Sequence, residues 1–474
     1  MTYIPGMLVH RWGVQVPASS LAACTRLYEA EGMVANAHLG SYNGALVNDF
    51  NDVFLMKGRE KRINYDIVNK VILAEEGDAD FAIDGTNGDV FVRQLAHWRK
   101  RERLSDGSEI RAFADGALEG YEYVPERLIP CFLASAADSG SAANDGNGTM
   151  KSIAGAFTIP LTEVSLQNFL TKAQNTGCIL MDAKTWADQA DMMLIEFASR
   201  DMQTKIGKGI SEHSYAGYAI QNTGTGINYV IVTNAEAANF TSYSTVTINT
   251  TSAGGHDIAW CRKITAITDM GDGTSKIEFD GAAVTVAAGY YVRASKNFMG
   301  QSESILLGSG YIGTNGKAAV RYRGVEDVYG HVFQGLLGVL KLGTHPPVYY
   351  AADDPANYAM AVGSGYREIG RCLIDTEGYV KTVLFNDTAQ RETSIICDDI
   401  GAGSTTYWCD YCWRNSQPAT EEPTRLRVPF AGGGWNGGTY CGPWSVIWSY
   451  APSNANWHCG ARLLVIPPWG ERGA

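Results

Sequence analysis

The sequence has no apolar run near the roughly 18 residues that a membrane-spanning helix needs. Its first residues, MTYIPGMLVHRWGV, contain no charged segment followed by an apolar core, so we expect neither a membrane span nor a secretory signal. Outside an oxidising compartment, the ten cysteines are expected to be reduced, buried thiols.

The sequence also lacks the compact motifs of several enzyme classes. No HExxH helix, GxSxG elbow or GK[ST] phosphate loop occurs, and the eight histidines are scattered. Gly308–Gly313 formally matches GxGxxG, but a hairpin-type turn, Thr314–Gly316, follows it where a dinucleotide site needs a helix. These absences lower the expectation of an enzyme.

Cys409 and Cys412 form a CxxC pair, which is a candidate metal or redox site. Cys441, His458 and Cys459 are the nearest further ligands in sequence. However, no second CxxC exists, and residues three apart on a strand point to opposite faces, which argues against zinc.

Basic residues are in the minority. The net charge of −12 and the pI near 5.2 argue against nucleic-acid binding, which needs a basic surface. One local basic run, Arg93–Arg103 (RQLAHWRKRER), is interpreted as a solvated edge strand or turn because its surroundings are acidic.

What the sequence does contain is typical of a globular, β-rich protein. It has 474 residues, enough for two to four domains, with 45% hydrophobic and 19% charged residues. The 53 glycines, 24 tyrosines and 11 tryptophans indicate many turns and much aromatic packing.

Two helices are predicted firmly, one from an N-cap near Thr162 to Gly177 and one over Lys184–Lys205. Leu21–Glu31 suggests a third, short helix, and residues 134–150 are small and polar enough to form an exposed loop. Short β-type runs occur at Ile67–Leu73, Gly88–Val92, Tyr229–Val232, Thr245–Ile248, Lys263–Ile267, Lys276–Phe279 and Tyr290–Ala294.

The stretch Ala431–Pro468 (AGGGWNGGTYCGPWSVIWSYAPSNANWHCGARLLVIPP) stands out in the chain. Gly and Asn residues allow tight turns there, and Tyr, Ser, Thr and His residues between them suit adaptable contacts. Composition alone leaves two interpretations open, a binding surface and a glycine-rich C-terminal β-meander.

Several short motifs of the chain follow one another in the order in which they occur in a known protein family. They are Gly432-Gly433-x-Trp435-Asn436-x-Gly438, Gly442, Ser453–Trp457, Gly460–Leu464, Tyr322–Gly330, Cys409–Cys412, Leu194–Ala198 with Gln203 and Ile206–Gly209, Asp49–Asn51, and Asp84–Val92. The chain thereby resembles phage receptor-binding proteins of the major-tropism-determinant type, whose C-type-lectin-like variable domains are diversified by retroelements. The resemblance touches nearly the whole chain and is strongest after about residue 320.

The resemblance implies an α+β protein with a C-type-lectin-like (formylglycine-generating-enzyme-like) fold. Residues 1–125 would be a mixed N-terminal region for virion attachment and oligomerisation. Residues 126–213 and 301–474 would be the two parts of the lectin-like domain. Between them, the spacing of the short β-type runs in residues 214–300 predicts an inserted small antiparallel β-barrel or β-sandwich.

The resemblance further implies a fixed frame with variable, ligand-facing residues between its members. The frame would be Trp435, Asn436, Gly438, Gly442, Asn454, Asn456, Trp457, Gly460 and Arg462. The candidate ligand-facing residues are Gly434, Gly437, Thr439, Tyr440, Ser445, Ile447, Ser449, Tyr450 and His458. Residues expected to flank the same surface are Tyr407, Trp408, Tyr411, Trp413, Trp444 and Trp448.

The function implied is recognition of a bacterial surface receptor, protein or glycan, by a virion tail fibre or tail tip made in the host cytoplasm. Other virion tail proteins would be partners, and the protein would be a homo-oligomer, expected to be a trimer. We expect no catalytic residue, metal or cofactor, no nucleic-acid partner and no membrane insertion. Two alternatives remain: a non-diversified tail or baseplate component, and a formylglycine-generating-type enzyme with a reactive cysteine pair.

Overall fold

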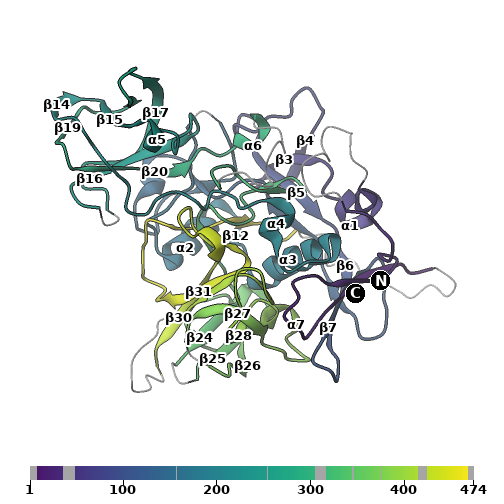
Figure 1. The fold of residues 1–474 in the computed structure, drawn as a ribbon. Coiled ribbons are helices and arrows are strands. Elements are labelled where there is room, and N and C mark those ends of the chain that lie inside the picture. The colour runs from purple at the N-terminus through teal and green to yellow at the C-terminus, as the bar shows by residue number, and fades with distance from the viewer. Residues whose placement is uncertain are drawn as a thin grey trace.

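The computed structural model describes residues 8–35, 48–155, 157–252, 255–304, 316–343, 346–374, 376–414 and 424–467. It is an α+β structure that is mostly β, with 38% strand and 14% helix (Figure 1). The glycine motif Gly308–Gly313 lies outside the described residues.

Two sheets are built from the N-terminal region, with strand orders β2-β1-β7-β6-β8 and β4-β3-β5-β9. The first contains β1 (Arg11–Val16), β2 (Thr25–Tyr28), β6 (His97–Arg103), β7 (Glu109–Ala114) and β8 (Glu122–Val124). The second contains β3 (Arg62–Asp66), β4 (Val71–Glu75), β5 (Asp89–Gln94) and β9 (Arg127–Pro130). Shorter elements nearby are η2 (Asp49–Asp52), α1 (Phe54–Lys57), β10 (Ser135–Ala136), η3 (Ser139–Ala142) and β11 (Met150–Lys151).

Two expectations for this region are wrong. Leu21–Glu31 is not a helix, because β2 pairs antiparallel with β1 and this pairing overrides local helix propensity. The basic run Arg93–Arg103 is not a solvated edge, since β6 lies between β7 and β8 and its Arg99 and Arg101 are buried.

The two firmly predicted helices exist. α2 (Leu166–Thr176) begins after the N-cap Ser165, three residues later than expected, and ends at Gly177 in the left-handed conformation. The second is divided into α3 (Ala183–Phe197) and α4 (Met202–Ile206). The division follows from Ala198, whose φ of 48° ends α3, and from Asp201, whose side chain caps α4.

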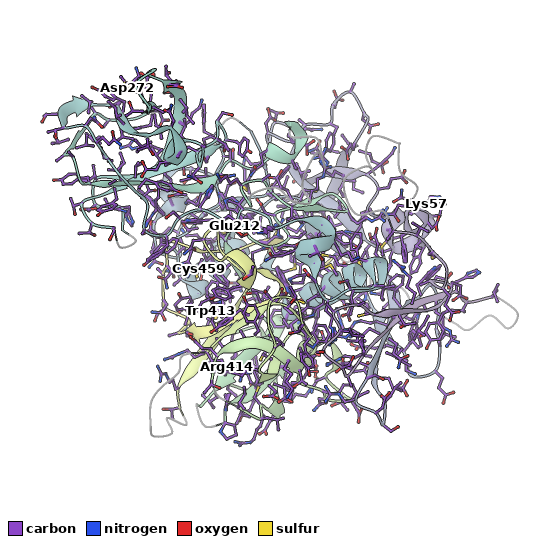
Figure 2. All side chains as sticks on the ribbon, in the orientation of Figure 1. Lys57, Glu212, Asp272, Trp413, Arg414 and Cys459 are labelled. Atoms are coloured by element: carbon purple, nitrogen blue, oxygen red, sulfur yellow. The ribbon has the colours of Figure 1, made fainter. Side chains whose placement is uncertain are left out.

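Residues 218–297 form a unit with its own hydrophobic core, at the upper left of Figure 1. Its main sheet has the order β13-β20-β16-β17-β18-β15, and β14 pairs with β19. The elements are β13 (Tyr218–Ala219), β14 (Gly224–Ile227), β15 (Tyr229–Thr233), α5 (Asn234–Ala237), β16 (Ser244–Asn249), β17 (Ala259–Asp269), β18 (Thr274–Phe279), β19 (Val284–Val286) and β20 (Tyr291–Asn297). Asp272 lies at the end of this unit away from the rest of the chain (Figure 2).

The C-terminal part is organised around a large sheet of order β26-β25-β24-β30-β31-β29-β27-β28. Its strands are β24 (Val339–Leu342), β25 (Val348–Ala352), β26 (Tyr366–Arg371), β27 (Gly378–Val383), β28 (Cys397–Ile400), β29 (Tyr411–Trp413), β30 (Leu426–Gly432) and β31 (Gly442–Tyr450). Associated elements are α6 (Gln301–Ser304), β21 (Arg321–Tyr322), β22 (Val325–Glu326), β23 (Phe333–Gly335), η4 (Pro355–Asn357), α7 (Gln390–Thr393), η5 (Gly438–Tyr440) and β32 (Cys459–Gly460). Finally, β12 (Ile179–Leu180) pairs antiparallel with β33 (Leu463–Leu464) near the C-terminus.

One hydrophobic core runs through most of the chain outside the 218–297 unit. It joins Val14 of β1, Val90 of β5, Trp186 of α3 and Trp444 of β31. The N-terminal region therefore packs on α3 and the C-terminal strands and shares their core.

Candidate functional site

Strand β31 lies between β30 and β29, and both of its faces are covered. Trp444 and Trp448 belong to the main core, whereas Ile447 belongs to a second hydrophobic cluster. Ser445 is also fully buried. The expectation that Ser445 and Ile447 face a ligand, with Trp444 and Trp448 beside them, is therefore wrong, because residues 442–448 of this central strand are buried on both faces.

The turn that precedes β31 is fixed by close backbone approaches. Gly433 has a φ of 89°, and a Cβ added there would lie 2.3 Å from the Cys441 sulfur. Gly434 is buried as well, so it cannot face a ligand as expected. Trp435 packs on Trp457 with ring centroids 4.8 Å apart. These residues form a frame.

After this frame, the chain reaches the protein surface at η5. Thr439 and Tyr440 are exposed, and Gly437 is half-buried. Gln203 of α4 holds the segment, because its Nε2 donates to the carbonyls of Gly438 (2.9 Å) and Cys441 (2.7 Å). The exposed side chains thus stand on a backbone that is anchored to a helix.

Tyr440 lies in a group of four aromatic rings, which we name the tyrosine cluster: Tyr379, Tyr411, Trp413 and Tyr440. Its ring centroid is 4.6 Å from that of Tyr411, 5.3 Å from that of Trp413 and 5.5 Å from that of Tyr379. All four side chains are partly exposed, and Figure 2 places Trp413 among the C-terminal strands.

Strand pairing assembles the tyrosine cluster. β29 pairs with both β27 and β31, which puts Tyr411 opposite Tyr379. The Tyr379 hydroxyl also shares a hydrogen bond of 2.7 Å with the Thr439 hydroxyl. Burial raises the pKa of Tyr379 and of Tyr411, so both hydroxyls remain protonated donors at neutral pH.

Sequence reasoning found four of these residues, Thr439, Tyr440, Tyr411 and Trp413, but missed Tyr379. Tyr379 lies more than 30 residues before Tyr411, and only the order of strands in the sheet brings it to the cluster.

Ser449, Tyr450 and His458 are half-buried and form a separate group. The Tyr450 hydroxyl lies 3.0 Å from Nε2 of His458, whose ring packs on Trp457 at 4.5 Å. Burial lowers the pKa of His458 to about 4, so the ring is neutral at pH 7.

Trp408 is buried against the N-terminal region and does not flank the tyrosine cluster as expected, and half-buried Tyr407 precedes it. The candidate pair Cys409 and Cys412 are both buried free thiols. In the described part of the chain, no group of His, Cys, Asp or Glu residues is arranged to hold a metal ion.

Comparison with known proteins gives no assignment. No family model matches the chain, and no curated protein matches it. Among the described residues, no helix is long and apolar enough to cross a membrane.

Proposed function

We propose that the chain is a receptor-binding protein of a phage tail, diversified by a retroelement, with the tyrosine cluster and Thr439 as its ligand-binding surface. The observation that carries this proposal is the assembly of Thr439, Tyr440, Tyr411 and Trp413, chosen from sequence alone, into one exposed group. Tyr and Trp side chains offer large contact areas at low entropic cost and dominate many interfaces.

A C-type-lectin-like domain made of residues 126–213 and 301–474 is part of the proposal. Three features support it. The first is the pairing of β12 with β33, which joins residues 126–213 to the end of residues 301–474. The second is the pair of helices α2 and α3, which precede the strands. The third is the departure of the chain into the 218–297 unit, with a core of its own, between the two segments.

The diversified positions under this proposal are Thr439 and Tyr440, because their exposed side chains can change without disturbing the core. Gly437, which the sequence also suggested, belongs to the frame, since a Cβ there would lie 2.5 Å from the buried Cys441 sulfur. Ser445 and Ile447 belong to the frame, since both are buried. A template repeat near the gene is expected to differ from this coding region at adenines in codons 439 and 440. Adenine differences confined to the codons of Ser445 and Ile447 would contradict the assignment.

A cluster of four rings gives modest affinity at a single site. Display as a homotrimer, with several copies on a tail tip, raises the apparent affinity by roughly 10²–10⁴ through effective concentration. Trimer formation is therefore part of the proposal, and sedimentation equilibrium of the purified chain tests it.

Binding is tested with the purified chain on whole bacterial cells and on an array of bacterial surface glycans. Tyr440→Ala removes the most exposed ring of the tyrosine cluster. We expect it to weaken binding about 30-fold, which corresponds to a loss of about 2 kcal/mol at an interface hot spot. Ile267→Ala is a matched control, because Ile267 is 39% exposed against 38% for Tyr440 and lies in the 218–297 unit. Equal loss in both variants, or binding unchanged by Tyr440→Ala, would refute the ligand-binding surface.

A further inference from the structure

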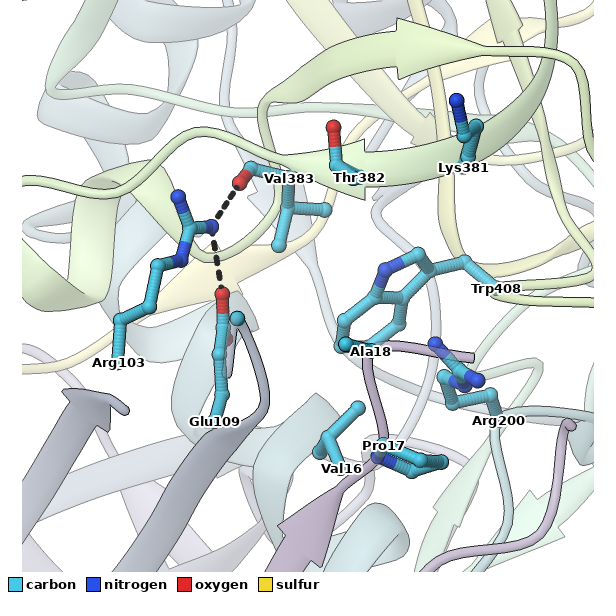
Figure 3. A pocket seen from close by; sticks show the side chains of 11 residues that line it. Val16, Pro17, Ala18, Arg103, Glu109, Arg200, Lys381, Thr382, Val383 and Trp408 are labelled. Carbon is cyan, nitrogen blue, oxygen red and sulfur yellow. Dashed lines mark hydrogen bonds and ion pairs between the residues drawn. The ribbon is translucent and has the colours of Figure 1, made fainter. Parts of the chain in front are cut away.

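A cavity of about 240 Å³ lies between the N-terminal region and the C-terminal sheet (Figure 3). No residue of the tyrosine cluster is among those that line it. Part of its wall is formed by residues 16–18 at the end of β1, by Arg103 and Glu109 of the β6–β7 hairpin, and by β27. Arg200, between α3 and α4, and Trp408 complete it. Neither the proposed receptor-binding surface nor the lectin-like frame uses this cavity.

Arg200 is the unusual member of the wall. It is only 2% exposed, and its Nη2 donates to the carbonyls of Ser19 (2.8 Å) and Leu21. Its Nε is buried without a partner, and no described carboxylate forms an ion pair with it. A guanidinium is charged at neutral pH, and burying a charge without a counter-charge is costly. Arg200 is therefore a buried cation with no carboxylate in contact among the described residues.

The other charged side chains at the cavity have ion-pair partners. The Glu109 carboxylate binds Arg103 (2.8 Å) as well as two further arginines, Arg101 and Arg111. Burial alone would raise the pKa of Glu109, but the charges of Arg101 and Arg111 hold it well below its usual range. Lys381 pairs with Asp399 at 3.0 Å, and Figure 3 shows its ammonium group pointing away from Trp408.

Among the charged side chains of this wall, Arg200 is the one without an ion pair to a described residue. A guanidinium forms charge-assisted hydrogen bonds with carboxylates, and the apolar side chains of the same wall suit an organic acid better than inorganic phosphate.

Trp408 gives the cavity an apolar wall beside that charge. The Arg200 Cζ lies 5.5 Å from the centre of the Trp408 ring, and the guanidinium lies below the indole in Figure 3. Tyr407 and Cys409 on either side of Trp408 have φ values of 54° and 63°, in the left-handed region that costs a non-glycine residue of order 1 kcal/mol or more.

The volume limits the ligand's size. Pockets for drug-sized ligands begin at roughly 300 Å³, so this cavity takes a smaller molecule or a single sugar residue. Pro17 and Ala18 at the wall, together with the indole, suit a face made of C–H groups.

We infer that this cavity is a second binding site, which takes the carboxylate of a small organic acid, such as a uronate residue of a glycan. Arg200 binds the carboxylate, and Trp408 packs on the C–H face of the ligand.

The full-length chain is titrated calorimetrically with D-glucuronate, acetate, D-glucose and inorganic phosphate. D-glucuronate is expected to bind with a Kd on the order of 1 mM, the strength typical of a ligand of this size. Glucose, which lacks the carboxylate, is expected not to bind. If acetate binds about tenfold more weakly than glucuronate, the site is assigned to a sugar acid. If acetate and glucuronate bind equally, the site is assigned to the carboxylate group alone. Both outcomes support the inference.

Two variants test the residues. Arg200→Met is expected to abolish glucuronate binding. Because Arg200 also donates to two backbone carbonyls, Ala18→Phe is a second variant, which narrows the cavity from an exposed position and weakens binding at least tenfold. Ala282→Phe, at an exposed position of the 218–297 unit, is the matched control and leaves binding unchanged.

Three results would overturn the inference: no saturable glucuronate binding, equal binding of glucose, or tighter binding of phosphate than of either carboxylate. Unchanged binding in Ala18→Phe would overturn it as well. Tyr440→Ala is expected to bind glucuronate normally, so a failure here and a failure of the receptor-binding proposal are distinguishable.

Discussion

Asp191 on α3 forms buried ion pairs with the N-terminal region, and their contribution to stability can be tested directly. Its carboxylate accepts from Arg111 Nη1 at 2.6 Å and from Arg99 Nη2. All three side chains are buried. Asp191→Asn keeps the side-chain volume and removes the charge, while Arg99 keeps Asp188 (3.2 Å) and Arg111 keeps Glu109 (3.0 Å).

Breaking a buried ion pair by removing one partner costs about 3–5 kcal/mol, because a buried charge is left uncompensated. The carboxylates that remain put the expected loss in the free energy of unfolding near the lower limit, about 3 kcal/mol. At about 2 °C per kcal/mol for a large domain, the Tm falls by roughly 6 °C. The fall in Tm is measured by near-UV circular dichroism at pH 7.

Glu278→Gln provides the control. Glu278 pairs with Lys276 at 3.0 Å on β18, with side chains 37% and 33% exposed, and such a pair is worth about 0–1 kcal/mol. A fall in Tm for Asp191→Asn no larger than that for Glu278→Gln would refute the reasoning.

The pH dependence of the Tm difference between the parent chain and Asp191→Asn gives a second check. Burial alone would raise the pKa of Asp191, but the charges of Arg111 and Arg99 lower it below the ordinary value. The stabilisation is therefore fully present above the unfolded pKa, about 4, and is lost as the pH falls through the lower folded value. We expect a constant Tm difference between pH 7 and pH 5 that narrows on further acidification; a difference that widens would contradict the electrostatic explanation.

Two further predictions concern stability. Gly442→Ala is expected to lower the Tm and the soluble yield, since its Cβ would lie 2.2 Å from a carboxylate oxygen of Asp410. Gly363→Ala, which has open space around it, is the control. Equal behaviour of the two variants would disprove the steric argument. Burial lowers the pKa of His213 to about 4, so the stability that its neutral ring contributes is present above about pH 6.5 and lost as the pH falls toward 4. His213→Gln, which retains a donor near Asn297, should show a flatter dependence of Tm on pH in this range, and a slope identical to that of the parent chain would count against it.

Local sequence signals predicted the helices well. The spacing of apolar residues located α2 and α3, and Gly177 marked the end of α2 because glycine adopts the left-handed conformation without strain. The break between α3 and α4 was missed, since it depends on Ala198 and on contacts of Arg200 with the distant residues Ser19 and Leu21.

The candidate site was predictable only in part. Gly437 and Gly438 indicated a surface turn, and Thr439 and Tyr440 in it are exposed. Ser445, in contrast, has the composition of a surface residue, and nothing local shows that its strand is covered on both faces.

The sequence by itself determined the periodic helices, the glycine turns and the choice of aromatic residues, because each of these depends on neighbours within a few positions. The tertiary structure alone decided which of those residues are exposed, that Tyr379 joins Tyr440, and that a basic strand is buried against Asp188 and Asp191. Sheet order and burial arise from contacts between segments hundreds of residues apart, and the energy of such contacts is not encoded in any short stretch of chain.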